Sequence, residues 1–389
     1  MAPFVETPAL SLLSNPRVEV SNEPDLLDGW WNSENIFSLE RRAIFSKAWI
    51  CISHRSRFTK PGDYISLELA GFPIVIILGK DRIARAFHNV CRHRAYTITK
   101  KPAGSSLVLG CRYHGWSYDT RGNLVKAPQF DGIAGFDKSQ NGLFKIRTCT
   151  DRGGFIHINL DASCITPAQD SPGCEELVGF AAEHDISAQS TFITGWELNG
   201  EFNWKVVESG DRTEIGTPTN IATDSLSLLD YMVRLFRRPT MNLASTSIPP
   251  TTTLLSFPNS PLWATLTTLP NSATQCTVKC DIFSTANPDS SLNANVLDAL
   301  EALFTSYIHS IEQKYAEMKN KRVSEEPEIL PILKAHLKLE RAAGREILVA
   351  RREEGRSEGY CRAEKVCKEL DRMARIGKCD AGESRGLDW

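Results

Sequence analysis

Two stretches, CRHR at residues 91–94 and CRYHGWSYD at residues 111–119, decide the fold of this chain. Each stretch holds one cysteine and one histidine, and residues 94–110 separate His93 from Cys111. Thiolate sulfur and neutral imidazole nitrogen both bind transition metals. The spacing therefore predicts one metal centre whose ligands are Cys91, His93, Cys111 and His114.

Two kinds of centre use such a ligand set. In a Rieske [2Fe–2S] cluster, two cysteines hold one iron and two histidines hold the other. Tetrahedral zinc also accepts two cysteines and two histidines, but zinc motifs usually pair the two cysteines in one short motif and the two histidines in another. Here each stretch supplies one ligand of each type, and zinc does not require the Gly115–Tyr118 continuation. The order of the ligands favours the Rieske cluster.

Composition limits the classes of protein that this chain can represent. It has 389 residues, of which 41% are hydrophobic and 24% charged, so a globular protein with two domains is expected. The formal net charge of −2 argues against nucleic-acid binding. No basic region precedes a long apolar stretch, so neither a signal peptide nor a membrane span is expected. The 11 cysteines do not suggest a disulfide scaffold, and a cytoplasmic location is expected.

Hydrophobic patterns predict an α+β chain. We expect an N-terminal helical lead-in at 1–50, an all-β Rieske domain at 51–160, a linker at 161–195, a catalytic-type domain at 196–352 and a charged tail at 353–389. The expected strands are 64–69, 74–78, 155–160, 196–207, 252–257, 262–269 and 275–283. The expected helices are 29–50, 297–315, 330–347 and 361–376. Both metal loops should close β-hairpins at a tip of the first domain, with the two histidines nearest solvent.

The metal stretches, followed by GNLVKAP at 122–128, resemble the Rieske domain of ring-hydroxylating oxygenase alpha subunits, in particular the choline-monooxygenase-like branch. FSLERRAIFSKAW at 37–49 and EFNWK at 201–205 are similar to the same family. The resemblance implies a Rieske β-sandwich plus a helix-grip domain, an antiparallel sheet with long C-terminal helices, assembled as a homotrimer. It also implies electrons from a flavin- and NAD(P)H-dependent reductase or a ferredoxin, and hydroxylation or demethylation of a small organic molecule.

Enzymes of that family bind a second, mononuclear iron through two histidines and one carboxylate. The matching positions of this chain are Gly216, Ile221 and Gln313, none of which gives the required ligand. The mononuclear iron site is therefore expected to be degenerate, and no catalytic residue is assigned. The alternative function is a pseudo-oxygenase, an electron carrier or redox-responsive binding protein that keeps only the cluster.

A few further residues carry weaker signals. His309 and Glu312 have the i, i+3 spacing of a helical metal site, but an exposed histidine is the simpler interpretation. His336 is expected on the surface, and Cys276 and Cys280 in a strand core. Glu208 and Asp211 are expected in a solvated loop. The resemblance stops after Val207 and resumes near Leu254, so an altered reading frame or splice choice over 208–250 is a third interpretation.

Overall fold

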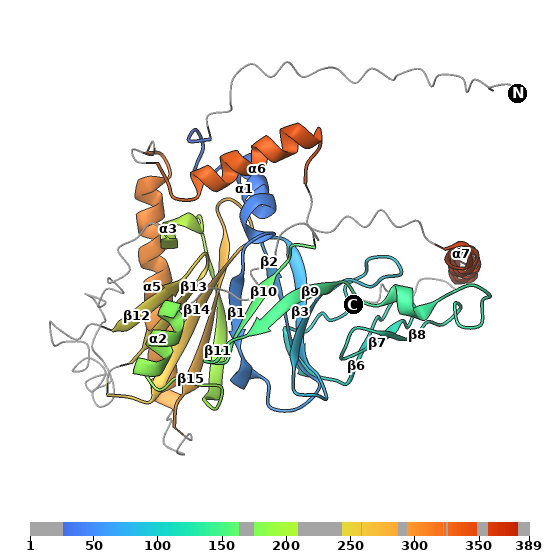
Figure 1. Cartoon of the computed structure of the whole chain (residues 1–389), viewed down its shortest axis with the longest axis horizontal. Coiled ribbons are helices and arrows are strands. Elements are labelled where there is room, and N and C mark those ends of the chain that lie inside the picture. Colours follow the sequence, from blue (N-terminus) through green and yellow to red (C-terminus); the bar gives the residue numbers. More distant parts are fainter. Residues whose placement is uncertain are drawn as a thin grey trace, which may run out of the picture.

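The computed structural model describes residues 26–162, 175–208, 243–257, 259–286, 294–321, 323, 326–347 and 357–379. Two β-rich parts lie side by side, and a long C-terminal helix lies at the far end of the first part (Figure 1). The predicted Gly216, Ile221 and Asp211, and most of the segment 208–250, lie outside the described residues.

The first part is built on a seven-stranded antiparallel sheet of order β1-β10-β9-β4-β3-β2-β5. Its strands are β1 Ile50–His54, β2 Asp63–Leu69, β3 Phe72–Leu78, β4 Ala84–His88, β5 Ala103–Ser105, β9 Lys145–Thr150 and β10 Phe155–Asn159. Strand β3 lies inside the sheet between β4 and β2, and its residues Ile74–Leu78 are buried on both faces. Because both faces of the strand are buried, its sequence is a continuous apolar run and does not alternate between apolar and polar residues.

A smaller three-stranded sheet, β6-β7-β8, completes the first part. Its strands are β6 Val108–Gly110, β7 Ser117–Asp119 and β8 Leu124–Lys126. Strands β6 and β7 form an antiparallel hairpin in which Leu109 pairs with Tyr118. The second metal stretch is the loop of this hairpin, as the sequence predicts. The first loop instead runs from β4 to β5, which are not neighbours in the sheet, and an isolated bridge between Val90 and Thr97 closes it.

The second part is a five-stranded antiparallel sheet of order β11-β15-β14-β13-β12. Its strands are β11 Thr191–Gly200, β12 Ala244–Ile248, β13 Thr252–Ser256, β14 Leu262–Pro270 and β15 Cys276–Ser284. Cys276 and Cys280 lie on the same face of β15 and are buried in the core, as expected. Helix α5, Ala294–Met318, packs against this sheet through an apolar stripe that includes Leu300, Phe304 and Ile308.

The N-terminal helix is shorter than the sequence predicts. It consists of α1, Glu34–Glu40, followed by a π-helical turn, η1, at Arg41–Phe45. The amide of Ser46 donates to the carbonyl of Arg41 at 3.0 Å, a five-residue bond that ends the helix before β1 begins. The expected helix over 29–50 is therefore correct only in its middle.

Helix α6, Leu330–Ala343, packs against α1 and η1. This packing contradicts the prediction made for His336. His336 is not a surface residue, because only 6% of it is exposed. Its Nε2 lies 3.2 Å from Glu340, whose carboxylate also accepts from Arg42 Nε at 2.7 Å. The packing of α6 against α1 and η1, which includes this ion pair, buries the histidine, and the charged local sequence did not indicate that packing.

Two further helices, α2 and α3, fall in segments where the sequence predicts no helix. The predicted linker at 161–195 contains helix α2, Glu175–Glu183, and the start of β11. A four-residue helix, α3 at Lys205–Glu208, replaces the end of the expected strand 196–207, because that strand finishes at Gly200. The charged tail contains α7, Glu358–Cys379, which extends past both ends of the predicted helix 361–376. Among the described helices, none combines the length and apolarity needed to cross a membrane.

Candidate metal centre

The two metal loops have the same backbone design. In the first, the Cys91 amide donates to Tyr96 at 2.8 Å and the Ala95 amide donates back to Cys91 at 2.9 Å. In the second, the Cys111 amide donates to Trp116 at 2.7 Å and that of Gly115 donates to Cys111 at 3.0 Å. Ala95 and Gly115 take the left-handed conformation, with φ of 55° and 72°. Each loop therefore folds back onto the backbone of its own cysteine, so that its cysteine and histidine side chains lie close together.

The loops bring the four predicted residues together. The ring centroids of His93 and His114 lie 4.6 Å apart, and the thiols of Cys91 and Cys111 are within hydrogen-bonding distance. Both cysteines are 3% exposed and His93 is 1% exposed. Two sulfur and two nitrogen donors thus converge in one buried place.

The ring nitrogens of the two histidines differ in their surroundings. Nδ1 of His93 and Nδ1 of His114 are buried and have no hydrogen-bond partner among the described residues. Nε2 of each ring is instead taken by a carboxylate, Glu364 at 2.7 Å and Asp371 at 3.1 Å. A buried nitrogen without a partner is costly, and metal binding would satisfy it. The donor set therefore fits a cluster held by two thiolates and two Nδ1 atoms.

Both carboxylates come from α7, which sequence analysis did not connect with the metal loops. Arg94 joins them, because its guanidinium donates to Glu364 at 3.0 Å and also to Asp371. Although burial favours the protonated acid, hydrogen bonds from His93 and Arg94 lower the pKa of Glu364. The pKa of Asp371 is lowered in the same way by Arg94 and His114. Both side chains are therefore anionic acceptors for the histidines.

Burial favours the neutral form of the His93 imidazole. It lowers the pKa of His93, and the Glu364 carboxylate only partly offsets this. The neutral ring with one free nitrogen is the form that binds a metal.

The cysteines share one hydrogen bond, which raises the pKa of Cys91 and lowers the pKa of Cys111 to about 6. Backbone amides of Tyr113 and His114 also donate to Cys111 and favour its thiolate. The hydroxyl of Tyr118 lies 3.2 Å from Sγ of Cys91 and accepts from the Arg92 amide at 3.1 Å. Since that amide already donates to its oxygen, the Tyr118 hydrogen points to the sulfur.

Aromatic rings enclose the histidine pair. His93 stacks on Trp116 with a centroid distance of 5.2 Å and an interplanar angle of 7°, and Phe130 meets its edge at 5.1 Å. Trp116 and Phe130 are fully buried. These rings exclude water from one side of the centre, while α7 covers the other.

The expected exposure of the histidines is therefore wrong. Helix α7 lies across the histidine edge, and only 2% of the His93 side chain and 8% of the His114 side chain are exposed. Glu364, Cys367 and Asp371 follow one another at i, i+3 and i+7, so they share one helix face. Cys367 lies within 4.8 Å of both histidines, measured between ligand atoms. This spacing can be recognised in the sequence and predicts that the three side chains share a helix face, but it does not predict that the face contacts the metal loops.

The described residues do not assemble a second iron site. Gln313, which stands where the family has its carboxylate ligand, is exposed on α5. Its neighbour Glu312 accepts from the Glu201 amide at 2.9 Å and contacts His309 at 3.3 Å. His309 is 69% exposed, which agrees with the simpler interpretation of this pair. Gln313 does not fit the expected iron, and the other two positions are not described.

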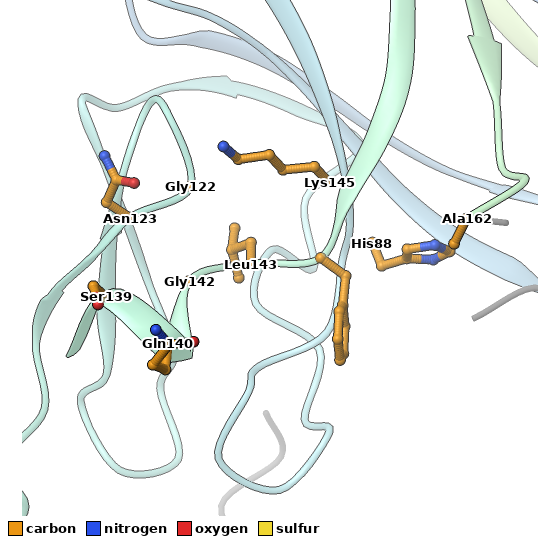
Figure 2. A pocket seen from close by; sticks show the side chains of 10 residues that line it. His88, Gly122, Asn123, Ser139, Gln140, Gly142, Leu143, Lys145 and Ala162 are labelled. Atoms are coloured by element: carbon orange, nitrogen blue, oxygen red, sulfur yellow. The ribbon is translucent and has the colours of Figure 1, made fainter. Parts of the chain in front are cut away.

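A polar pocket of about 420 Å³ lies in the first part, apart from the metal loops. His88, Asn123, Ser139, Gln140 and Lys145 are among its lining residues (Figure 2). None of the four metal-site residues lines it, so the pocket is a separate feature of the surface.

Comparison with known proteins identifies the cofactor type. Residues 48–137 match the model of the Rieske [2Fe-2S] domain, so this part of the chain is a Rieske domain and its cofactor is a [2Fe–2S] cluster. The carnitine monooxygenase oxygenase subunit of Acinetobacter baumannii is 33% identical over 180 residues, 46% of this chain and 47% of that protein. The benzene 1,2-dioxygenase alpha subunit of Pseudomonas putida is 35% identical over 136 residues, 35% of this chain and 30% of that protein.

Solved structures extend the likeness to the second part. A quaternary ammonium Rieske monooxygenase superposes with a TM-score of 0.57 at 22% identity, covering 75% of this chain and 85% of that one. This supports the predicted α+β fold, a Rieske domain beside an antiparallel sheet with long helices. By sequence, the matches reach only about half the length of the carnitine relative.

Proposed function

We propose that this Rieske-domain chain is an iron–sulfur oxidoreductase of the oxygenase class. In this proposal Cys91, His93, Cys111 and His114 hold the cluster, and a flavin- and NAD(P)H-dependent reductase or a ferredoxin supplies single electrons. The electrons serve the hydroxylation or demethylation of a small organic molecule. The observation that carries the proposal is the pair of buried, unpartnered Nδ1 atoms beside two thiols.

When bound, a [2Fe–2S] cluster supplies one-electron redox chemistry at a potential set by hydrogen bonding and burial. The chain's own residues prepare that environment. Glu364 and Asp371 accept from Nε2 and so turn Nδ1 of each histidine inward. Tyr118 donates to a cysteine sulfur, and Trp116 excludes water.

The relatives support the oxidation of a small organic molecule, because they include proteins named for carnitine and benzene. A homotrimer is proposed on the family resemblance, in which neighbouring subunits would exchange electrons.

A pseudo-oxygenase is the second candidate, and one observation favours it. Gln313, which is exposed on α5, stands where the resemblance expects the carboxylate ligand, and Gly216 and Ile221 stand where it expects the two histidines. Under this alternative the chain stores and passes single electrons, and another protein carries out the oxidation.

Iron counting and turnover separate the two candidates. The purified chain is reduced by a reductase with NADH, exposed to oxygen, and assayed for oxidised small molecules with carnitine as the first probe. An oxygenase should hold about three irons per chain and form product, whereas a pseudo-oxygenase should hold about two and form none. A His309→Ala variant tests the exposed pair: loss of one of three irons would identify a ligand there. Failure to accept any electron would contradict both candidates.

A further inference from the structure

Helix α7 makes an extensive, specific contact with the Rieske domain. The Tyr360 hydroxyl donates to the carbonyl of His93 at 2.8 Å, and Arg362 donates to Ala134 at 2.6 Å. Tyr360, Ala363 and Cys367 are buried in the same cluster of apolar residues as the two ligand cysteines.

The close approach at the start of α7 requires glycine. A Cβ atom added to Gly359 would lie 2.2 Å from the carbonyl carbon of Gly135. Both groups are backbone, so one of the segments would have to move. The helix is therefore fitted to this surface at its first turn, and its carboxylates follow on the same side.

We propose that α7 is an intramolecular cap of the iron–sulfur site, in which Glu364 and Asp371 are positioning residues for the two histidine ligands. The inference rests on the proposed function, in which these two histidines hold the cluster. Each carboxylate accepts from one Nε2 atom, which fixes the ring orientation and leaves Nδ1 for iron. The cap also closes the histidine edge to solvent and to any partner.

The charges of the cap act on the reduction potential. Two carboxylates and the Arg94 guanidinium leave one net negative charge beside the histidines. Lys368 lies 3.8 Å from Glu364 but is 68% exposed, so solvent screens it. Reduction adds negative charge to the cluster, and a nearby anion opposes it. The cap therefore lowers the potential relative to the same domain without these carboxylates.

Variants of the full chain test the cap. Glu364→Gln and Asp371→Asn remove the charges while keeping the side-chain shape, and Glu369→Gln on an exposed face of α7 is the matched control. Gly359→Ala keeps both carboxylates but places a Cβ atom against the backbone of Gly135 and so disturbs the docking of α7. Because alanine favours the helix more than glycine does, a change in potential in this variant reports on the lost contact and not on an unfolded helix. Iron and sulfide are counted first, then the midpoint potential at one pH and the histidine nitrogen couplings of the reduced cluster by pulsed EPR.

Each charge-removing variant and Gly359→Ala should raise the potential and alter the nitrogen couplings, with the largest shift in the Glu364→Gln/Asp371→Asn double variant. Glu369→Gln should match the wild type. If the double variant loses iron, the two single variants provide the same comparison. A double variant that keeps its iron and sulfide with wild-type potential and couplings would overturn the cap. A wild-type chain without sulfide would instead contradict the proposed function.

Discussion

Nε2 of His93 lies 2.7 Å from a carboxylate oxygen of Glu364, although 271 positions separate the two residues. This contact joins the C-terminal helix to a residue that the spacing of the metal loops marks as a ligand. It also explains why the histidine edge is buried rather than exposed. A histidine held at Nε2 can offer only Nδ1, and the structure leaves that nitrogen unpartnered.

Replacing Cys111 by alanine should abolish the cluster. One iron would lose half of its protein ligands, and the other three donors cannot hold the pair of irons. Iron content should fall from about two per chain to near zero, together with the visible absorption of the cluster. Cys149→Ala on β9 is the control, because Cys149 is a free, half-buried cysteine away from the metal loops. Equal iron in Cys111→Ala and the wild type would show that the sulfur is no ligand.

Replacing Tyr118 by phenylalanine should lower the reduction potential. The hydroxyl donates to Sγ of Cys91, and this bond strengthens when reduction makes the sulfur more negative. If the bond is about 1 kcal/mol stronger in the reduced state, the loss corresponds to roughly 40 mV for one electron. A redox titration measures the shift. An unchanged or higher potential, with iron content intact, would count against the hydroxyl as a donor.

The potential of the wild-type chain is a separate prediction. Trp116 directly follows Gly115 in the second metal loop and has no hydroxyl group to donate to a cluster sulfur, so hydrogen bonding stabilises the reduced cluster less. We expect a midpoint in the low part of the Rieske range, which spans roughly −150 to +300 mV. The α7 carboxylates act in the same direction. A titration midpoint near the top of the range would contradict this expectation.

Acid should destabilise the chain through His54. Burial lowers the pKa of His54 from 6.5 to about 4, so the folded state keeps it neutral. The unfolded state binds the extra proton below pH 6.5, and stability is therefore lost as the pH falls from 6.5 towards 4. Linkage gives a loss of about 2 kcal/mol at pH 5 relative to pH 7.5.

Urea unfolding at pH 7.5 and pH 5 measures this loss. A His54→Gln variant should be less stable at pH 7.5 but show a smaller difference between the two pH values. His309→Gln serves as the control, since His309 is exposed. The same pH dependence in all three chains would rule out His54 as its source.

Lys205 should be important for stability rather than for iron binding. It pairs with Glu40, which is fully buried and also accepts from Trp204 Nε1 at 2.7 Å. Lys205→Met leaves a buried carboxylate without its cation, and the free energy of unfolding should fall by about 3–5 kcal/mol. Urea unfolding checks this, with the exposed Lys101→Met as control. Adding Glu40→Gln should recover part of the loss, and no recovery would contradict the pairing argument.

Local patterns were enough to predict much of the fold. The period of apolar residues placed α5, and short apolar runs placed β13, β14 and β15 to within about two residues. The four residues Cys91, His93, Cys111 and His114 could be selected because each loop carries its pair within a few positions. The structure brings these four side chains together, and their ligation is a proposal.

Contacts between distant segments could not be predicted in the same way. The face of α7 that carries Glu364 and Asp371 looks like an ordinary charged helix face until its partner is known. His336 has charged neighbours in sequence, and it is buried where α6 packs against α1 and η1, beside the ion pair of Glu340 with Arg42. A sequence pattern records which side chains share a face, whereas tertiary packing decides what that face meets.

The most direct test is a joint count of iron and acid-labile sulfide, followed by pulsed EPR of the dithionite-reduced chain. We predict about two irons and two sulfides per chain, a single-electron signal, and nitrogen couplings from two histidines. His93→Ala and His114→Ala should each remove one coupling or the cluster. One zinc ion per chain with no sulfide, or a cluster without nitrogen couplings, would contradict the central claim that two cysteines and two histidines hold a Rieske cluster here.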